Sequence, residues 1–304
     1  MKIAITGATG LIGSRLVKAL KARGAEVTVL SRRPASAAAS LGVDAIAWDS
    51  LREPAPNEAL AGRDGVIHLA GEPVAQRWTA GAKRAILESR EIGTRNLVAG
   101  IAAAEPRPGA LISSSAVGYY GPRGAELIDE QSAPGSDFLA KVCVAWEREA
   151  VAAEQLGLRV VLVRTGIVLD ASGGALKAML APFKVGVGGP IGGGKQYMSW
   201  IHGDDIVGLY LAALDNPSWR GPVNGTAPHP VTNRAFAKAL GAALRRPALL
   251  PVAGFVMRAR FGEMAQIITE GQRAIPAAAT AGGYQFIAPE LEPALASVLA
   301  DGSP

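Results

Sequence analysis

The sequence has little of several residue types that define common protein classes. Its 304 residues include one cysteine, Cys143, three histidines and only 5% aromatic residues. A single cysteine cannot form a disulfide within the chain, so nothing indicates an oxidising compartment. The histidines show no spacing with carboxylates or with the cysteine that is typical of a metal site. We therefore predict no bound metal.

Long hydrophobic runs are also missing. No apolar stretch reaches the roughly 20 residues that a membrane-spanning helix needs. The sequence opens on a strand-like segment, residues 2–5, and not on the basic and apolar pattern of a signal peptide. We expect a soluble, cytoplasmic protein without a membrane partner.

Charge of one sign is only slightly in excess. The chain has 31 basic and 26 acidic residues, a net charge of +5. Basic residues such as Lys18, Lys21 and Arg23 follow helical patterns without interleaved aromatic residues, which favours solvated helix faces over nucleic-acid binding. We expect a small-molecule substrate and no nucleic-acid partner, and both a monomer and a homodimer stay open.

The first half of the chain alternates short β-branched runs with longer helical patterns. This alternation is typical of βαβ units and of a parallel sheet covered on both faces. We predict helices that begin near Leu11, Ala80 and Phe138. In such a doubly wound sheet, ligands bind at the carboxyl ends of the strands. The predicted strands are residues 2–5, 26–30, 45–48, 65–69, 110–113 and 159–163.

From about Gly173 the sequence changes to glycine-rich and proline-rich turns. Scattered helices are predicted after Asp204, Thr232 and Val252. The expected fold is α/β: a Rossmann doubly wound parallel sheet in residues 1–172, to which some later segments return. Residues 173–304 would form a smaller, mostly helical substrate lobe.

A glycine-rich turn, Gly7-Ala8-Thr9-Gly10-Leu11-Ile12-Gly13, lies between the first strand and the first helix. This is the context that a dinucleotide-binding fingerprint requires. Gly7 permits a tight turn, and Gly10 lets the backbone approach a pyrophosphate. The amide groups of Leu11 and Ile12 would face the phosphates, where the helix dipole favours negative charge. We include Thr9, in the same turn, among the predicted contacts.

The second strand ends in Ser31, Arg32 and Arg33, where a protein that prefers NAD would normally have an acidic residue. Two guanidinium groups and a hydroxyl suit the 2′-phosphate of NADP, which arginine can bind bidentately. A solvated basic turn before Pro34 is the alternative. The position predicts NADP(H) as the cofactor.

Further cofactor contacts are predicted at the ends of the other strands. Asp49 could accept a hydrogen bond from adenine, although a turn cap explains it almost as well. Small residues after the fourth strand would let the cofactor pass. The remaining predicted contacts are Leu69, Ala70, Gly71, Glu72, Arg90, Ser113 and Arg164.

The glycine-rich turn and the later segment Ser113-Ser114-Ser115-Ala116-Val117-Gly118-Tyr119-Tyr120-Gly121 together resemble the extended short-chain dehydrogenases, the group of sugar-nucleotide epimerases and dehydratases. His68-Leu69-Ala70-Gly71-Glu72-Pro73 and Gly262-Glu263-Met264 are similar to an atypical subgroup known as epimerase family proteins, which has a C-terminal segment of unassigned function. The resemblance covers essentially the whole chain. It implies an NADP-bound Rossmann domain with an unsettled reaction.

The resemblance also implies that a catalytic pair has been replaced. In the wider superfamily a tyrosine transfers a proton while a lysine four residues later lowers its pKa. The corresponding positions here are Leu139 and Cys143, which can supply neither the proton nor the ammonium charge. A shift of two residues would pair Asp137 with Lys141, but would turn the side chain about half a revolution away from the cleft.

Other residues could take over catalysis. Ser115 keeps the position of the superfamily serine that binds a substrate carbonyl or hydroxyl, although a local backbone contact is an alternative. Tyr119 or Tyr120 could replace the missing acid if a cation lowers its pKa. Arg90 could be that cation.

More than one role is possible for Arg90 and for Cys143. Arg90 could also hold a substrate anion or the cofactor ribose, or form an ion pair with Glu147 or another helix acid. Cys143 could be reactive if Arg90 stabilises its thiolate, but a buried, inert cysteine is the more common case. His68 is read as a core histidine, and Trp200 and His202 as substrate contacts.

We predict an NADP(H)-dependent oxidoreductase or epimerase-like enzyme that acts on a small carbonyl or hydroxyl substrate. The alternative is a catalytically silent NADP(H)-binding sensor or scaffold.

Overall fold

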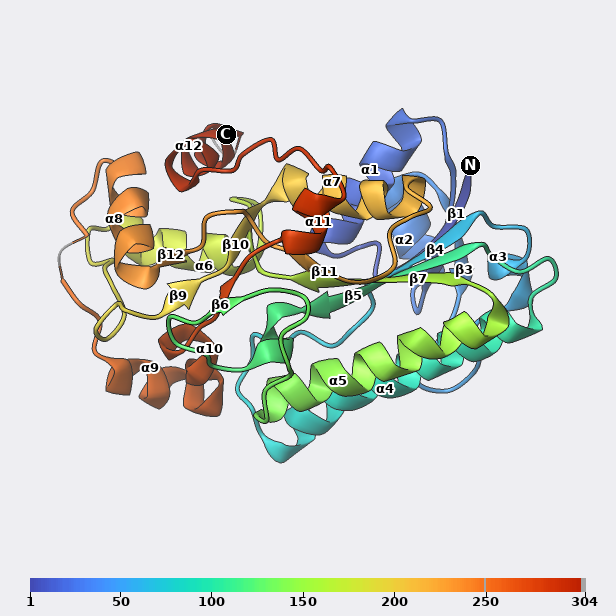
Figure 1. Cartoon of the computed structure of the whole chain (residues 1–304), viewed down its shortest axis with the longest axis horizontal. Helices are drawn as coiled ribbons and strands as arrows, with labels where there is room; N and C mark the ends of the chain where they lie inside the picture. Colours follow the sequence, from blue (N-terminus) through green and yellow to red (C-terminus); the bar gives the residue numbers. More distant parts are fainter. Residues whose placement is uncertain (249, 302–304) are drawn as a thin grey trace.

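A seven-stranded sheet forms the centre of the protein, and all its strands run parallel (Figure 1). The structure is a computed structural model that describes residues 1–248 and 250–301. The strand order is that of a doubly wound sheet with one further strand at an edge. In spatial order the strands are β11 (Gly221–Gly225), β7 (Arg159–Thr165), β5 (Ala110–Ala116), β4 (Gly65–His68), β1 (Lys2–Thr6), β2 (Glu26–Ser31) and β3 (Asp44–Ala47).

Helices cover both faces of this sheet (Figure 1). Side chains alternate along each strand, so that Ile3 and Ile5 of β1 pack in one apolar cluster and Ala4 in the other. One face carries α1 (Leu11–Ala22), α2 (Pro34–Leu41) and α7 (Gly203–Asp215), and the other carries α3 (Asn57–Leu60), α4 (Ala80–Ala103) and α5 (Phe138–Val151). The predicted Rossmann architecture is confirmed.

The predicted strands are all present, with bounds that differ by up to three residues. β5 runs on to Ala116 and β7 to Thr165, so that Ser115 lies inside a strand. One strand of the sheet, β11, was not predicted. Its sequence Gly-Pro-Val-Asn-Gly has no β-branched run, and it pairs only with β7 at the sheet edge, where proline and glycine are tolerated.

A smaller and mostly helical portion lies beyond the carboxyl ends of β5 and β7, at the left of Figure 1. Its own apolar core includes Leu176, Trp200, Phe236 and Leu295. Two short strand pairs tie it to the sheet domain, and a third lies within the portion itself. Its helices are α6 (Gly174–Lys184), α8 (Asn233–Ala243), α9 (Gly254–Phe261), α10 (Gln266–Thr269) and α12 (Leu291–Asp301). The strand pairs are β6 (Leu127–Ile128) with β13 (Arg273–Ala274), β8 (Ile167–Leu169) with β10 (Trp200–His202), and β9 (Tyr197–Met198) with β12 (Val231–Thr232).

Several elements cross between the two portions. α7 and β11 come late in the sequence yet join the sheet and its helical layer, and α11 (Ala277–Ala281) packs on β11. The described residues also include three short 3-10 helices: η1 (Val117–Tyr120), η2 (Ala152–Leu156) and η3 (Gly262–Ala265).

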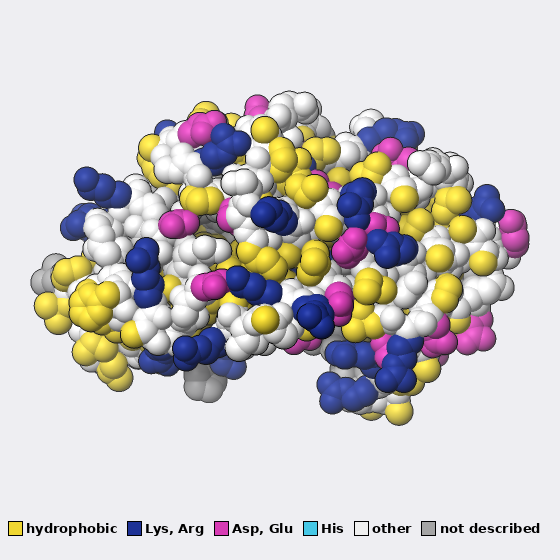
Figure 2. Space-filling view, turned by 90° about the horizontal axis from the view of Figure 1, so that it is seen from below, with side chains coloured by type: hydrophobic (Ala, Val, Ile, Leu, Met, Phe, Trp, Pro, Cys, Tyr) yellow, Lys and Arg dark blue, Asp and Glu magenta, His cyan; other side chains and the backbone are white. Residues whose placement is uncertain are grey.

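The surface carries mixed charges. On the face seen in Figure 2, lysine and arginine side chains are scattered, with acidic side chains between several of them. Among the helices that the structure describes, none has both the length and the apolar character to cross a membrane.

Two glycines of α4 test the packing of this helix against the segment between β3 and α3. A Cβ at Gly100 would press on the Ala55 carbonyl oxygen and lie 2.8 Å from the Ala55 Cβ, whereas at Gly81 it would meet nothing nearer than 3.9 Å. We expect Gly100→Ala to lower the free energy of unfolding by about 1–3 kcal/mol. Gly81→Ala should leave it unchanged or raise it by up to about 1 kcal/mol. Urea denaturation followed by circular dichroism measures both, and equal effects would contradict the packing argument.

Candidate functional site

The turn between β1 and α1 leaves backbone amide groups free to bind an anion. Gly7 has a φ of +69°, and a Cβ there would lie 2.6 Å from a backbone carbon of the segment after β4. Helix α1 begins at Leu11 without a side-chain cap and without an acidic residue in its first turn. The first amides of the helix, including that of Ile12, are therefore available to a phosphate. Thr9 and Gly10 are exposed in the same turn.

A buried hydrogen-bond chain fixes the neighbouring end of β4. The Thr6 hydroxyl accepts hydrogen bonds from the Leu69 and Ala70 amides at 3.2 Å, and its oxygen lies 2.6 Å from Nδ1 of His68. Nε2 of His68 lies 2.9 Å from the Thr94 hydroxyl. Burial lowers the pKa of His68 to about 3, so the ring is neutral. His68 is thus a core residue that holds the carboxyl end of β4 in place.

The ends of β2 and β3 lie where the sequence predicts the adenosine end of the cofactor. Ser31 Oγ accepts a hydrogen bond from the Arg33 amide at 3.1 Å. Arg32 and Arg33 are exposed, and within the described residues neither forms an ion pair. Asp49 Oδ1 accepts from the Leu51 amide at 3.1 Å, which is the turn cap left open as its alternative role.

Three of the predicted site residues form a buried polar network beneath the pocket. Arg164 binds Glu147 bidentately, with Nε and Nη2 each 2.8 Å from a carboxylate oxygen. Ser115 Oγ donates to the same carboxylate at 2.6 Å. The Tyr120 hydroxyl accepts from Arg164 at 3.0 Å and donates to Asn224 Oδ1 at 2.7 Å. The prediction that Arg164 contacts the cofactor is therefore at odds with its geometry, because its charge is neutralised inside the protein.

The same network argues against catalysis by Ser115 and Tyr120. Both hydroxyl hydrogens, of Ser115 and Tyr120, are committed to buried acceptors. Burial raises the pKa of Tyr120 to about 12 even though Arg164 opposes the shift. The Tyr119 ring lies against the Arg164 guanidinium, 3.5 Å from ring centroid to Cζ. Ser113 Oγ donates to the Ser114 carbonyl and is buried.

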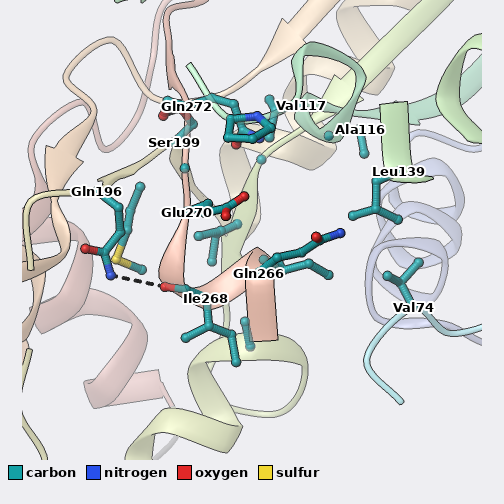
Figure 3. A pocket seen from close by; sticks show the side chains of 18 of the residues that line it. Val74, Ala116, Val117, Leu139, Gln196, Ser199, Gln266, Ile268, Glu270 and Gln272 are labelled. Carbon is teal, nitrogen blue, oxygen red and sulfur yellow. Dashed lines mark hydrogen bonds between the residues drawn. The ribbon is translucent and has the colours of Figure 1, made fainter. Parts of the chain in front are cut away.

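A pocket of about 330 Å³ lies where the carboxyl ends of β5 and β7 meet the C-terminal portion. Figure 3 shows Val74 and Leu139 on one side, Gln196 and Ser199 on the other, and Gln266 and Glu270 reaching between them. Apolar side chains form most of the wall. They include Val117, Leu139, Val142, Met179, Ile191, Met198 and Ile268.

Leu139 and Cys143 line this pocket from α5, at the positions that the resemblance aligns with tyrosine and lysine. Burial raises the pKa of Cys143 to about 12, with Glu147 adding to the effect and Arg90 opposing it. The thiol therefore stays protonated at neutral pH, and the reading of an inert cysteine is the better one. Lys141, the alternative lysine, is exposed.

Arg90 lines the pocket from α4 but forms no ion pair with Glu147, contrary to one of its predicted readings. Its Nη1 donates to the Glu72 carbonyl at 2.9 Å and to the Ile86 carbonyl at 3.2 Å. The guanidinium lies over Gly71, where a Cβ would be 3.0 Å from Cζ. Arg90 is thus held in place by neutral groups.

The predicted substrate residues lie outside the pocket wall. Trp200 is fully buried and donates from Nε1 to the His229 carbonyl. His202 is buried, and its Nδ1 accepts from the Asp204 amide at the start of α7. Their positions correct the prediction of substrate contact: one residue fills a core and the other caps a helix.

Several polar residues of the pocket were not predicted. Gln196, Gln266, Glu270 and Gln272 come from segments far from the Rossmann motifs in sequence. Gly262 to Met264 marked their neighbourhood through the resemblance, but no local pattern indicates which side chains face the sheet. Within the described residues, no group of three or more His, Cys, Asp or Glu is arranged to hold a metal.

Comparisons with known proteins cover the whole molecule. Residues 3–224 match the NAD dependent epimerase/dehydratase family, and residues 252–298 match a domain of unknown function, DUF1731. The human epimerase family protein SDR39U1 is 38% identical over 99% of this chain and 100% of its own. A crystal structure of its isoform 2 with NADPH has a TM-score of 0.89 at 37% identity, and covers 99% of this chain and 100% of that one.

Two other relatives show that the similarity extends to proteins from a plant and a bacterium. The chloroplastic SDR39U1 homolog of Arabidopsis thaliana is 40% identical over 98% of this chain and 87% of its own. A nucleoside-diphosphate sugar epimerase from Corynebacterium glutamicum has a TM-score of 0.81 at 34% identity, covering 98% of this chain and 58% of that one. The similarity extends over both the sheet and the helical portion.

The buried ion pair beneath the pocket should dominate local stability. We expect Glu147→Gln to lower the free energy of unfolding by about 3–5 kcal/mol, because it leaves the Arg164 charge buried and uncompensated. Arg148→Gln, which removes exposed ion pairs with Glu91 and Glu149, is the control and should change the free energy of unfolding far less. Urea denaturation measures both. Similar losses of unfolding free energy for the two variants would show that the buried pair stabilises the protein no more than the exposed pairs do.

Proposed function

Since this chain belongs to the NAD dependent epimerase/dehydratase family, we propose that it binds NADP(H) and reduces or oxidises a small carbonyl or hydroxyl substrate in the pocket. The observation that carries the proposal is the position of the pocket. It joins the carboxyl ends of β5 and β7 to α5, at the edge of a doubly wound sheet where ligands bind. When bound, the cofactor supplies or accepts a hydride.

The cofactor's phosphates would be held by the β1–α1 turn. The uncapped amides of Leu11 and Ile12 suit a pyrophosphate, and the glycine backbone at Gly7 and Gly10 allows its close approach. Because Gly71 has no side chain, the cofactor could pass beside Arg90 at this position. These features favour a dinucleotide over a mononucleotide, because β4 separates the turn after β1 from the pocket at the ends of β5 and β7, and a longer ligand is needed to reach both.

Arg32 and Arg33 would select the phosphorylated cofactor. Both side chains are exposed and free of ion pairs within the described chain, so their guanidinium groups are available to a 2′-phosphate. The human relative, whose crystal structure contains NADPH, supports this choice.

Water would supply the proton of the reaction. Ser115 and Tyr120 have committed their hydroxyl hydrogens, and the Cys143 thiol is a weak donor. Glu270 lines the pocket and is exposed, so the pocket reaches solvent on that side. Without a positioned acid, the reaction would lack the roughly 10²–10⁴-fold acceleration that general acid catalysis contributes.

The commitment of these hydroxyls also favours a second function, that of a silent NADP(H)-binding sensor or scaffold. In that role the cofactor would stabilise the fold without turnover. The two functions differ in whether bound NADPH is consumed.

NADPH consumption separates the two functions. On incubation with a panel of small aldehydes and ketones, we expect slow loss of NADPH absorbance, and Leu139→Trp should abolish it by filling the pocket while NADPH binding persists. Cofactor binding is followed by calorimetry. If NADPH binds tightly yet is never oxidised across the panel, the sensor role replaces the enzyme.

Charge at the end of β2 should set cofactor preference. The double variant Arg32→Ala, Arg33→Ala is expected to bind NADPH about 10–100-fold more weakly, because one or two charge-assisted contacts of about 1.5–3 kcal/mol are lost. NADH affinity should change little. Arg23→Ala, at the far end of α1, is the matched control. Equal losses for NADPH and NADH would contradict recognition of the 2′-phosphate.

A further inference from the structure

Arg90 is a half-buried cation that forms no ion pair in the part of the chain that the structure describes. Only neutral groups hold it: the carbonyls of Glu72 and Ile86 accept from Nη1, and the Trp146 ring centroid lies 4.9 Å from Cζ. Nη2 and Nε donate to no described residue. Burial lowers the pKa of Arg90, and the Glu72 carboxylate opposes this shift without forming an ion pair. Arginine remains charged in proteins. A partly desolvated charge without an ion pair is stabilised when an anion binds beside it.

A second unpartnered donor lies in the same wall. Trp146 is 4% exposed and lines the pocket, and its buried Nε1 has no hydrogen-bond partner among the described residues. Buried indole N–H groups usually have one. The Arg90 guanidinium stacks on the Trp146 ring, and both side chains have N–H groups without an acceptor among the described residues. These N–H groups indicate an acceptor that belongs to a bound molecule.

We propose that the pocket binds a monocarboxylate with an apolar body, and that Arg90 and Trp146 hold its carboxylate. This deepens the proposed function and rests on it for the assignment of the pocket as the substrate site. The planar guanidinium matches a carboxylate in bidentate geometry.

The charges of the pocket limit the ligand to a single negative charge. Arg90 is the only lysine or arginine among its lining residues, while Asp137 and Glu270 are both acidic. One carboxylate would balance Arg90, but a diphosphate would place further negative charge near two acids with no second cation. Nucleoside-diphosphate sugars, which the name of the Corynebacterium relative indicates, do not suit this charge distribution.

The wall of the pocket defines the rest of the ligand. Leu139, Val142, Met179, Ile191 and Ile268 present apolar surface, and the volume of about 330 Å³ is at the small end of ligand pockets. The glutamines at the opposite side leave room for one neutral polar group, such as the carbonyl or hydroxyl of the proposed reaction. A short oxo or hydroxy acid fits all these features.

Calorimetry on the NADPH-loaded protein tests the carboxylate. The probes are butyrate, hexanoate and octanoate, each with its primary amide as an isosteric neutral control, and UDP-glucose as the rival class. We expect at least one acid to bind about tenfold or more tightly than its amide. Arg90→Met should remove this preference, and Arg90→Lys should retain part of it. Arg84→Met, an exposed arginine on the same helix, should keep it in full.

A substitution at Trp146 provides a second, independent test of the carboxylate site. Trp146→Phe keeps the ring but removes Nε1, and is expected to weaken acid binding several-fold with no effect on amide binding. NADPH affinity measured on every variant separates a substrate contact from a cofactor contact.

Four results would overturn the inference: acids and amides that bind equally, no acid that binds, tighter binding of UDP-glucose, or an Arg90→Met protein whose NADPH affinity falls while acid binding persists. Calorimetry reports binding and not turnover. Acid binding without NADPH oxidation would therefore refute hydride transfer alone, whereas oxidation with neutral ketones and no preference for acids would refute the carboxylate alone.

Discussion

The bidentate pair between Arg164 and Glu147 fixes the relative positions of the elements around the pocket. It joins β7 to α5 inside the protein, and Ser115 from β5 and Tyr120 from η1 complete its hydrogen bonds. Either charge alone would be strongly unfavourable in this environment, so the pair constrains all four elements together. Because Ser115 donates to Glu147, the serine position that carries catalysis in related folds is part of the scaffold here.

One face of helix α5 contributes both to the pocket and to the buried network. Leu139, Cys143 and Glu147 are four residues apart in turn and therefore follow one stripe of the helix. Leu139 and Cys143 line the pocket, and Glu147 lies below it in the network. An apolar side chain and a neutral thiol next to a saturated carboxylate leave this stripe without a proton donor of useful pKa. In the proposed function, the pocket would therefore select its ligand by shape and by the charge of Arg90.

Local sequence patterns were sufficient for the sheet but not for the site. The strand and helix periodicities and the glycine turn depend on neighbours in sequence, and they predicted six strands and the start of α1 correctly. The missed strand, β11, lies at an edge and needs no apolar run. Tyr120 and Asn224 are 104 positions apart, and nothing in either segment indicates that they meet. The glutamines of the pocket wall were missed for the same reason, since tertiary packing alone decides which way they face.

The buried pair also determines whether Arg90 has an acidic partner on α5. The sequence left Glu147 open as a partner for Arg90, and a pair between them would have neutralised the Arg90 charge. Arg164 occupies both carboxylate oxygens of Glu147, so no acid remains for Arg90 on that helix stripe. An arginine stacked on Trp146 and bonded only to carbonyl groups is the result. The positive charge that an anionic ligand would need is thus a consequence of how Arg164 is neutralised one layer deeper.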